Sequence, residues 1–347
     1  MTTEYRPVSR RTLLTAALGG AAAGIAGQSL IAGAAAAEQG PKLLVGTVDG
    51  LGNGLLLLSD PGLTGTPASL AVNGRPNDIA GTPDGLCAYV ATQSGPGLSI
   101  VDIGARRVTG EIGVGGFANQ AVVSPDGKVV YVASGSSGAG GSRGHVAVVD
   151  AANGEVKARI QAGLLPSHLA ITPDGRRLFV GDERAKGVTV IDTAKQQVSG
   201  SFKTEKTPLQ LAIDPKGKRL YVTTQRELVT FDLGTGNASG VTALEGRPGG
   251  LAVHPNGNFA VVSVHTGRTS PAALVVVNVN SGKVLTRWDN GRAYGPVALN
   301  HDGGTAFVLD QENRKATSAD IATGKPDNSL PTPNSEKPTC VAFVETA

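Results

Sequence analysis

The chain has 347 residues, enough for a large buried core, and its 31 basic and 28 acidic side chains leave a formal net charge of +3. Residues 1–37 hold three of the basic and one of the acidic side chains, so the remainder carries 28 and 27. This even balance lacks the basic excess that nucleic-acid binding usually needs, and we expect no nucleic-acid partner.

The first stretch has the pattern of a targeting segment. Ser9–Leu14 reads SRRTLL and fits the twin-arginine export pattern, the Ala/Gly-rich run Ala16–Ala34 fits its apolar region, and Ala35–Ala37 offers a small-residue cleavage site. We therefore expect residues 1–37 to be a signal peptide and 38–347 to be one exported domain, located in the periplasm, at the cell surface or outside the cell. A membrane anchor is the alternative, but the cleavage site favours removal, which would leave no membrane span.

A four-residue turn motif recurs along the rest of the chain. It reads TPDG at Thr82–Gly85, and its other copies begin at Ser124, Thr172, Asp214, His254 and Asn300. Proline presets φ, Asp or Asn bonds to its own backbone, and Gly takes a positive φ, so each copy predicts a tight turn between antiparallel strands. The copies recur every 40–48 residues. A period near 40 residues with several short strands per unit is typical of a β-propeller.

The number of units predicts the number of blades. Units begin at Pro76, Ala118, Pro166, Pro208, Pro248, Tyr294 and Pro338, and the last one, KPTCVAF, has no turn after it. Pairing this final strand with the first strands, KLLVGT and GLLLLSD, completes a seventh blade and removes free sheet edges. The expected fold is all-β, a seven-bladed β-propeller of four-stranded antiparallel blades. Its blades span 42–74 with 337–347, then 76–117, 118–165, 166–207, 208–247, 248–293 and 294–336.

The segments PDGKVVYVAS, GHVAVVDAANGEVKARI and PSHLAITPDGRRLFVGD resemble the YVTN-type propeller repeat, which is similar to the propeller of quinoprotein amine dehydrogenases. The resemblance covers essentially the whole chain after residue 37 and implies the propeller architecture. Relatives of this kind include lactonases, dehydrogenase subunits, cofactor-bearing reductases and binding proteins, so the resemblance leaves the activity open.

The repeat also supplies a background against which unusual residues stand out. The strand after each turn motif contains a residue pair, aromatic–valine in most units as at Tyr89-Val90, and we call it the YV-type strand. The loops before each inner strand and after each YV-type strand open on one face around the channel, where a binding site is expected. Two places after the YV valine, small or hydroxyl residues prevail, and Asp182 and Asp310 are the exceptions. The candidate ligand-binding residues on this face are His168, Asp182, Glu183, Asp310, Gln311, His265, Arg268, Asp78, Gln120 and Gln210.

Among these candidates, His168 is the most informative. Pairing about the turn at 173–175 puts His168 opposite Asp182, within about one residue of register. A histidine beside a carboxylate is a metal ligand with its partner, an acid/base pair or a structural bond, and the sequence leaves all three open. His254 and His301 fall in turns of the opposite face and are interpreted as turn residues. No cofactor motif and no metal-binding spacing is present, so no cofactor or metal ligand is assigned.

Three hypotheses of function follow. The favoured one is an exported binding or scaffold module, a monomer that presents its polar loop face to a small ligand or a protein partner. The alternative is a metal-assisted, lactonase-like hydrolase in which His168, Asp182, Asp310 and His265 hold an ion. The third is the propeller subunit of a redox complex. Cys87 and Cys340 lie at opposite ends of their strands, and we expect free thiols rather than a disulfide.

Overall fold

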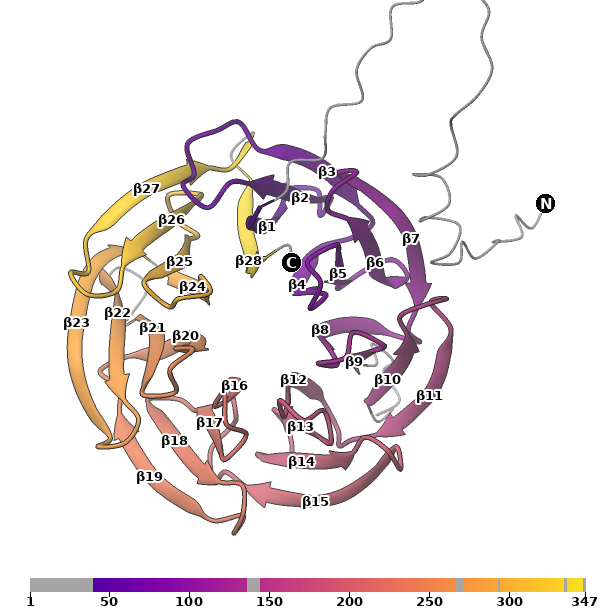
Figure 1. Ribbon diagram of the computed structural model, residues 1–347, viewed down its shortest axis with the longest axis vertical. Coiled ribbons are helices and arrows are strands. Elements are labelled where there is room, and N and C mark those ends of the chain that lie inside the picture. The colour runs from indigo at the N-terminus through magenta and orange to yellow at the C-terminus, as the bar shows by residue number, and fades with distance from the viewer. Residues whose placement is uncertain (1–39, 136–143, 266–270, 293, 334–335, 346–347) are drawn as a thin grey trace, which may run out of the picture.

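The computed structural model describes residues 40–135, 144–265, 271–292, 294–333 and 336–345. Seven four-stranded antiparallel sheets are arranged as blades in a ring around a central channel (Figure 1). From the channel outward, the first four blades contain β28 (Lys337–Val344), β1 (Lys42–Val48), β2 (Gly54–Ser59) and β3 (Ala68–Val72); β4 (Pro76–Gly81), β5 (Cys87–Thr92), β6 (Gly97–Asp102) and β7 (Arg107–Gly113); β8 (Phe117–Val123), β9 (Val129–Gly135), β10 (His145–Asp150) and β11 (Val156–Gln161); and β12 (Pro166–Ile171), β13 (Arg177–Asp182), β14 (Gly187–Asp192) and β15 (Gln197–Lys203).

The remaining three blades contain β16 (Gln210–Ile213), β17 (Arg219–Thr223), β18 (Glu227–Asp232) and β19 (Ala238–Ala243); β20 (Arg247–Val253), β21 (Phe259–His265), β22 (Pro271–Asn278) and β23 (Lys283–Arg292); and β24 (Tyr294–Leu299), β25 (Thr305–Asp310), β26 (Lys315–Asp320) and β27 (Pro326–Pro331). The expected seven-bladed fold is therefore confirmed. No described segment forms a helix long and apolar enough to cross a bilayer.

The recurring turns join the first and second strands of six blades. At the first of them, Gly85 has a φ of 67° and donates its N–H to the carbonyl of Thr82 at 2.9 Å. The Thr82 hydroxyl bonds to Asp84, which also accepts the N–H of Leu86. This network explains why the motif needs a hydroxyl, an acid or amide and a glycine at these places. We call the face that carries these turns the turn face and the opposite one the loop face.

The core lies between neighbouring blades. The second strand of each blade is apolar on both sides, and in β13 the side chains of Leu178, Phe179 and Val180 are wholly inaccessible to solvent. Phe202 stacks between Phe179, at 5.9 Å between ring centroids, and Phe231 of the next blade, at 5.6 Å. Burying such a side chain contributes about 1.5–3 kcal/mol, so this packing holds each blade against the next.

The two chain ends close the ring within one blade. Strand β28 pairs antiparallel with β1, with Leu44 opposite Ala342 and Gly46 opposite Cys340. Closure by the terminal strands is thus confirmed. Cys340 is buried in this blade, and neither Cys87 nor Cys340 forms a disulfide, as expected.

Candidate functional site

Two neighbouring residues at the loop face form an ionisable pair. His168 lies on the channel-lining strand β12 and is in register with Gly181, while Asp182 is opposite Pro166 because a bulge separates Pro166 from His168. The side chain that His168 meets is that of Glu183, with 3.7 Å between Nε2 and Oε1. The interaction with His168 is the main reason that the pKa of Glu183 lies below its usual range.

A second pair comes from the blade that contains β20 and β21. Arg247 begins β20 and is in register with His265 at the end of β21. Burial lowers the pKa of His265 and the charge of Arg247 lowers it further. Arg247 also contributes to the lowered pKa of Glu183, two blades away. Arg247 therefore acts on both Glu183 and His265, and Glu183 is paired with His168. We call His168, Glu183, His265 and Arg247 the loop-face cluster.

Asp182 and Asp310 have the same local role in two different blades. Asp182 is 1% exposed, and its carboxylate accepts the backbone N–H groups of Leu164, Arg184 and Ala185. Asp310 is 2% exposed and accepts both the backbone N–H and the side-chain amide of Asn313. Both carboxylates hold the loop that follows their strand. The presence of Asp182 and Asp310 at a position where the other units have small or hydroxyl residues thus has a structural cause.

The channel-lining candidates bond from blade to blade. One carboxylate oxygen of Asp78 accepts the N–H of Ala121 at 3.1 Å, and the amide oxygen of Gln120 accepts the N–H of Leu169 at 2.6 Å. Both bonds tie an inner strand to the inner strand of the next blade. Burial raises the pKa of Asp78 to about 7, and the bond from Ala121 opposes this only in part. This half-buried carboxyl group is therefore close to its titration point at neutral pH.

The remaining candidates are more scattered. Gln210 is half-buried at the start of β16, and exposed Gln311 donates its side-chain amide to the carbonyl of Pro338 at 3.4 Å. Arg268 lies outside the described residues. The four-residue metal set of the hydrolase hypothesis is not assembled, because no three His, Cys, Asp or Glu side chains of the described ranges converge on a point where an ion could bind.

The turn face has a cavity of about 550 Å³ where the terminal strands close the ring. At four other turns, the turn glycine packs closely against the turn proline of the preceding blade. A Cβ atom built on the glycine would lie only 3.2–3.5 Å from that proline, as at Gly127, Gly175, Gly217 and Gly257. The closing blade has no such turn, since its inner strand β28 is the last strand of the chain. Turn packing is therefore incomplete at this point of the ring, and the cavity lies there.

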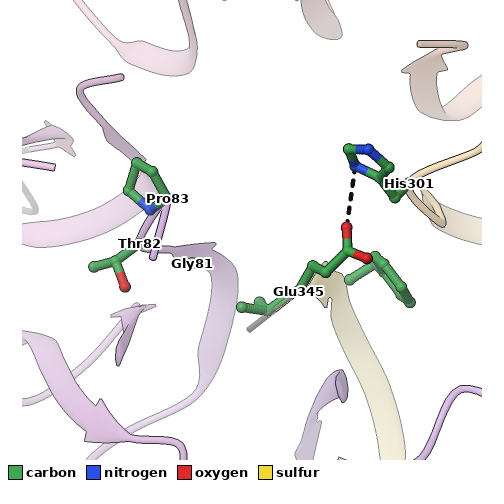
Figure 2. A pocket seen from close by; sticks show the side chains of 7 residues that line it. Gly81, Thr82, Pro83, His301 and Glu345 are labelled. Carbon is green, nitrogen blue, oxygen red and sulfur yellow. Dashed lines mark ion pairs between the residues drawn. The ribbon is translucent and has the colours of Figure 1, made fainter. Parts of the chain in front are cut away.

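Side chains from three blades line this turn-face cavity (Figure 2). His301 and Glu345 are paired on one side of it, with 3.1 Å between Nδ1 and Oε2, and Thr82 and Pro83 lie on the other side. The His301 side chain is 83% exposed, so the pair is solvated and adds little to stability. His301 is a turn residue as interpreted, but it also faces a cavity.

Sequence reasoning missed Arg247 and Glu345. The signal in the sequence for Arg247 is that the residue just before a unit's first residue is also a cation at Arg75 and Lys337. Glu345 follows the last strand and has no counterpart in the other units, so the repeat provides no background for it.

The sequence matches no protein-family model and no curated protein. Solved structures do resemble it. Hydrazine synthase from Kuenenia stuttgartiensis superposes with a TM-score of 0.69 at 21% identity, over 77% of this chain and 89% of that one. A putative 6-phosphogluconolactonase from Bacteroides uniformis superposes with a TM-score of 0.69 at 16% identity, over 88% of this chain and all of that one. At these identities the likeness defines the class by fold alone: a seven-bladed β-propeller.

Proposed function

We propose that this chain is an exported β-propeller of the YVTN type that binds a small ligand at the loop-face mouth of its channel. The observation that carries the proposal is the loop-face cluster. His168, Glu183, His265 and Arg247 come from two blades of the loop face and include two groups with perturbed pKa values. Perturbed ionisable groups at the mouth of a channel are typical of binding sites.

The bonding of the other carboxylates supports a binding role over metal-assisted catalysis. Asp182 and Asp310 are buried and hold loop backbone, so their oxygens are directed to N–H groups of the chain itself. The pair of His168 and Glu183, by contrast, remains partly open to solvent, with side chains 17% and 42% exposed. A ligand at the mouth would therefore meet the cluster and not the two aspartates.

Native mass spectrometry of residues 38–347 recovered after export tests the proposal. We expect the wild-type protein to carry a small molecule, and the Glu183→Gln/Arg247→Gln variant to have lost it. A matched control, Asp174→Asn/Arg176→Gln, changes the same kinds of residue on the turn face and should retain the molecule. The proposal fails if all three proteins are empty, or if the cluster variant retains what the wild type binds.

A lactonase-like hydrolase is the second candidate, supported by the similarity to a putative 6-phosphogluconolactonase. In this version His168, oriented by Glu183, would act as a general base that takes a proton from the attacking water. The test is the rate of 6-phosphogluconolactone opening with and without the protein. Acceleration that disappears in His168→Gln and persists in His301→Gln would favour the hydrolase, and a rate equal to the uncatalysed one would exclude this substrate. The redox-subunit hypothesis rests on the fold shared with hydrazine synthase.

A further inference from the structure

One repeat position at the loop face is enriched in cations. It is the residue immediately before the first residue of each unit, and in the described part of the chain it is occupied by Arg75, Phe117, Leu165, Thr207, Arg247 and Lys337. No carboxylate occurs among them. Each residue lies at the loop-face end of an innermost strand, and these strands border the channel (Figure 1). We call Arg75, Arg247 and Lys337 the mouth cations.

The mouth cations are exposed and have no carboxylate within ion-pairing distance in the described ranges. Their charges nevertheless act on residues that line the channel. Arg247 lowers the pKa values of Glu183 and His265, and Arg75 opposes the rise in the pKa of Cys340, which burial brings to about 12. The positive charges thus belong to the mouth, where Arg247 attracts the Glu183 carboxylate without forming an ion pair with it.

The buried acidic groups of the same face are bonded inward, whereas Glu205, Glu245 and Glu312 are exposed in loops outside this repeat position. Asp182, Asp310 and Glu336 are 1%, 2% and 6% exposed, and the first two accept backbone N–H groups of their own loops. Glu336, next to Lys337, accepts the hydroxyl of Thr47. Glu183 is paired with His168. At the repeat position itself the described residues are cationic or uncharged, so the starts of the inner strands present positive charge to an incoming molecule, although the chain after residue 37 is almost neutral.

We propose that the ligand of the loop face is a small molecule with two or more anionic groups, phosphate or carboxylate, held by Arg75, Arg247 and Lys337. This inference rests on the proposed function and adds the ligand's charge class. The mouth cations come from three blades of one ring, so a single anionic group cannot engage all of them side by side. A ligand with several anionic groups spread over its length fits this arrangement, and arginine supplies a planar fork suited to either phosphate or carboxylate.

Isothermal titration calorimetry with two probes, pyrophosphate and citrate, tests the inference on residues 38–347. An exposed charge contact changes affinity about fivefold, so the variant Arg75→Gln/Arg247→Gln/Lys337→Gln should bind at least one probe roughly 100-fold more weakly. The matched control Lys128→Gln/Arg176→Gln/Lys216→Gln removes the same charge from the turn face and should bind as the wild type does. Affinity of the wild type should fall as salt rises from 50 to 500 mM because exposed charges are screened.

The outcomes separate this inference from the proposed function. Binding of neither probe at 50 mM salt, or equal loss in the mouth and control variants, would overturn the anionic class. If native mass spectrometry then finds an uncharged or cationic molecule that disappears in Glu183→Gln/Arg247→Gln, the loop face is a binding site and only the charge class is wrong. If no molecule is found either, both proposals fail. Stronger binding of pyrophosphate supports a phosphate-bearing ligand, and stronger binding of citrate supports a carboxylate-bearing one.

Discussion

The Asp78→Asn substitution should stabilise the propeller at neutral pH and above. An asparagine at this place keeps an oxygen that accepts the N–H of Ala121, as the amide of Gln120 does for Leu169 in the neighbouring blade. What the substitution removes is the cost of ionising a buried carboxyl group. A folded pKa of about 7 against 3.8 for the free group corresponds to at most about 4 kcal/mol, at roughly 1.4 kcal/mol per pKa unit.

The sign and the size of the stability change on Asp78→Asn follow from the difference in proton binding between the folded and the unfolded protein. Between pH 4 and 7 the folded protein keeps a proton on Asp78 that the unfolded chain has released, so this residue's contribution to stability falls as pH rises through that window. Because Asp78 is half-buried and its charge is therefore partly screened by solvent, we expect a gain of about 1–3 kcal/mol for Asp78→Asn at pH 8, shrinking to near zero at pH 4.

Urea unfolding from pH 4 to 8, with the wild-type protein as the reference at each pH, measures this gain. The difference between the two proteins isolates Asp78, since other carboxylates with lowered pKa values, such as Asp126 and Asp174, are present in both. A difference that does not change with pH, or a variant less stable than the wild type at pH 8, would refute the reasoning.

Three further predictions concern stability and reactivity. Asp182→Ala removes the acceptor of three backbone N–H groups and should cost about 2–3 kcal/mol, visible as a lower thermal midpoint, and an unchanged midpoint would mean that the loop does not need this carboxylate. His301→Ala breaks only a solvated pair with Glu345 and should change the free energy of unfolding by less than about 1 kcal/mol; a larger loss in urea unfolding would show that the cavity wall is structural. Burial raises the pKa of Cys340 to about 12, so its thiol should resist iodoacetamide at pH 8 in the folded protein and react once unfolded, and prompt labelling of the folded protein would contradict its burial.

The fold could be predicted because its determinants are local and repeated. Each turn motif contains its own hydrogen-bonding groups, as the bonds among Thr82, Asp84 and Gly85 show, and neighbouring copies confirm one another. Closure by the terminal strands followed from counting the repeat units, because the last unit is incomplete and needs the first strands to complete its blade. The incomplete turn ring was also visible in the sequence, because the last inner strand has no turn after it, but the cavity that results from it was not anticipated.

The candidate site was harder to predict because its contacts depend on register and on loop backbone. A bulge between Pro166 and His168 moves the register by one residue and makes Glu183, not Asp182, the partner of His168. The role of Asp182 depends on N–H groups in the loop that contains Leu164, and a sequence does not reveal which backbone groups lack a partner. Comparison of equivalent positions detected unusual residues but did not distinguish structural from functional causes.

The most direct test of the central claim is a crystal structure of residues 38–347 recovered after export, with attention to density at both mouths of the channel. The account predicts a bound small molecule at the loop face, in contact with Glu183 and Arg247. A loop face without ligand density, together with a molecule in the turn-face cavity beside His301, would contradict it.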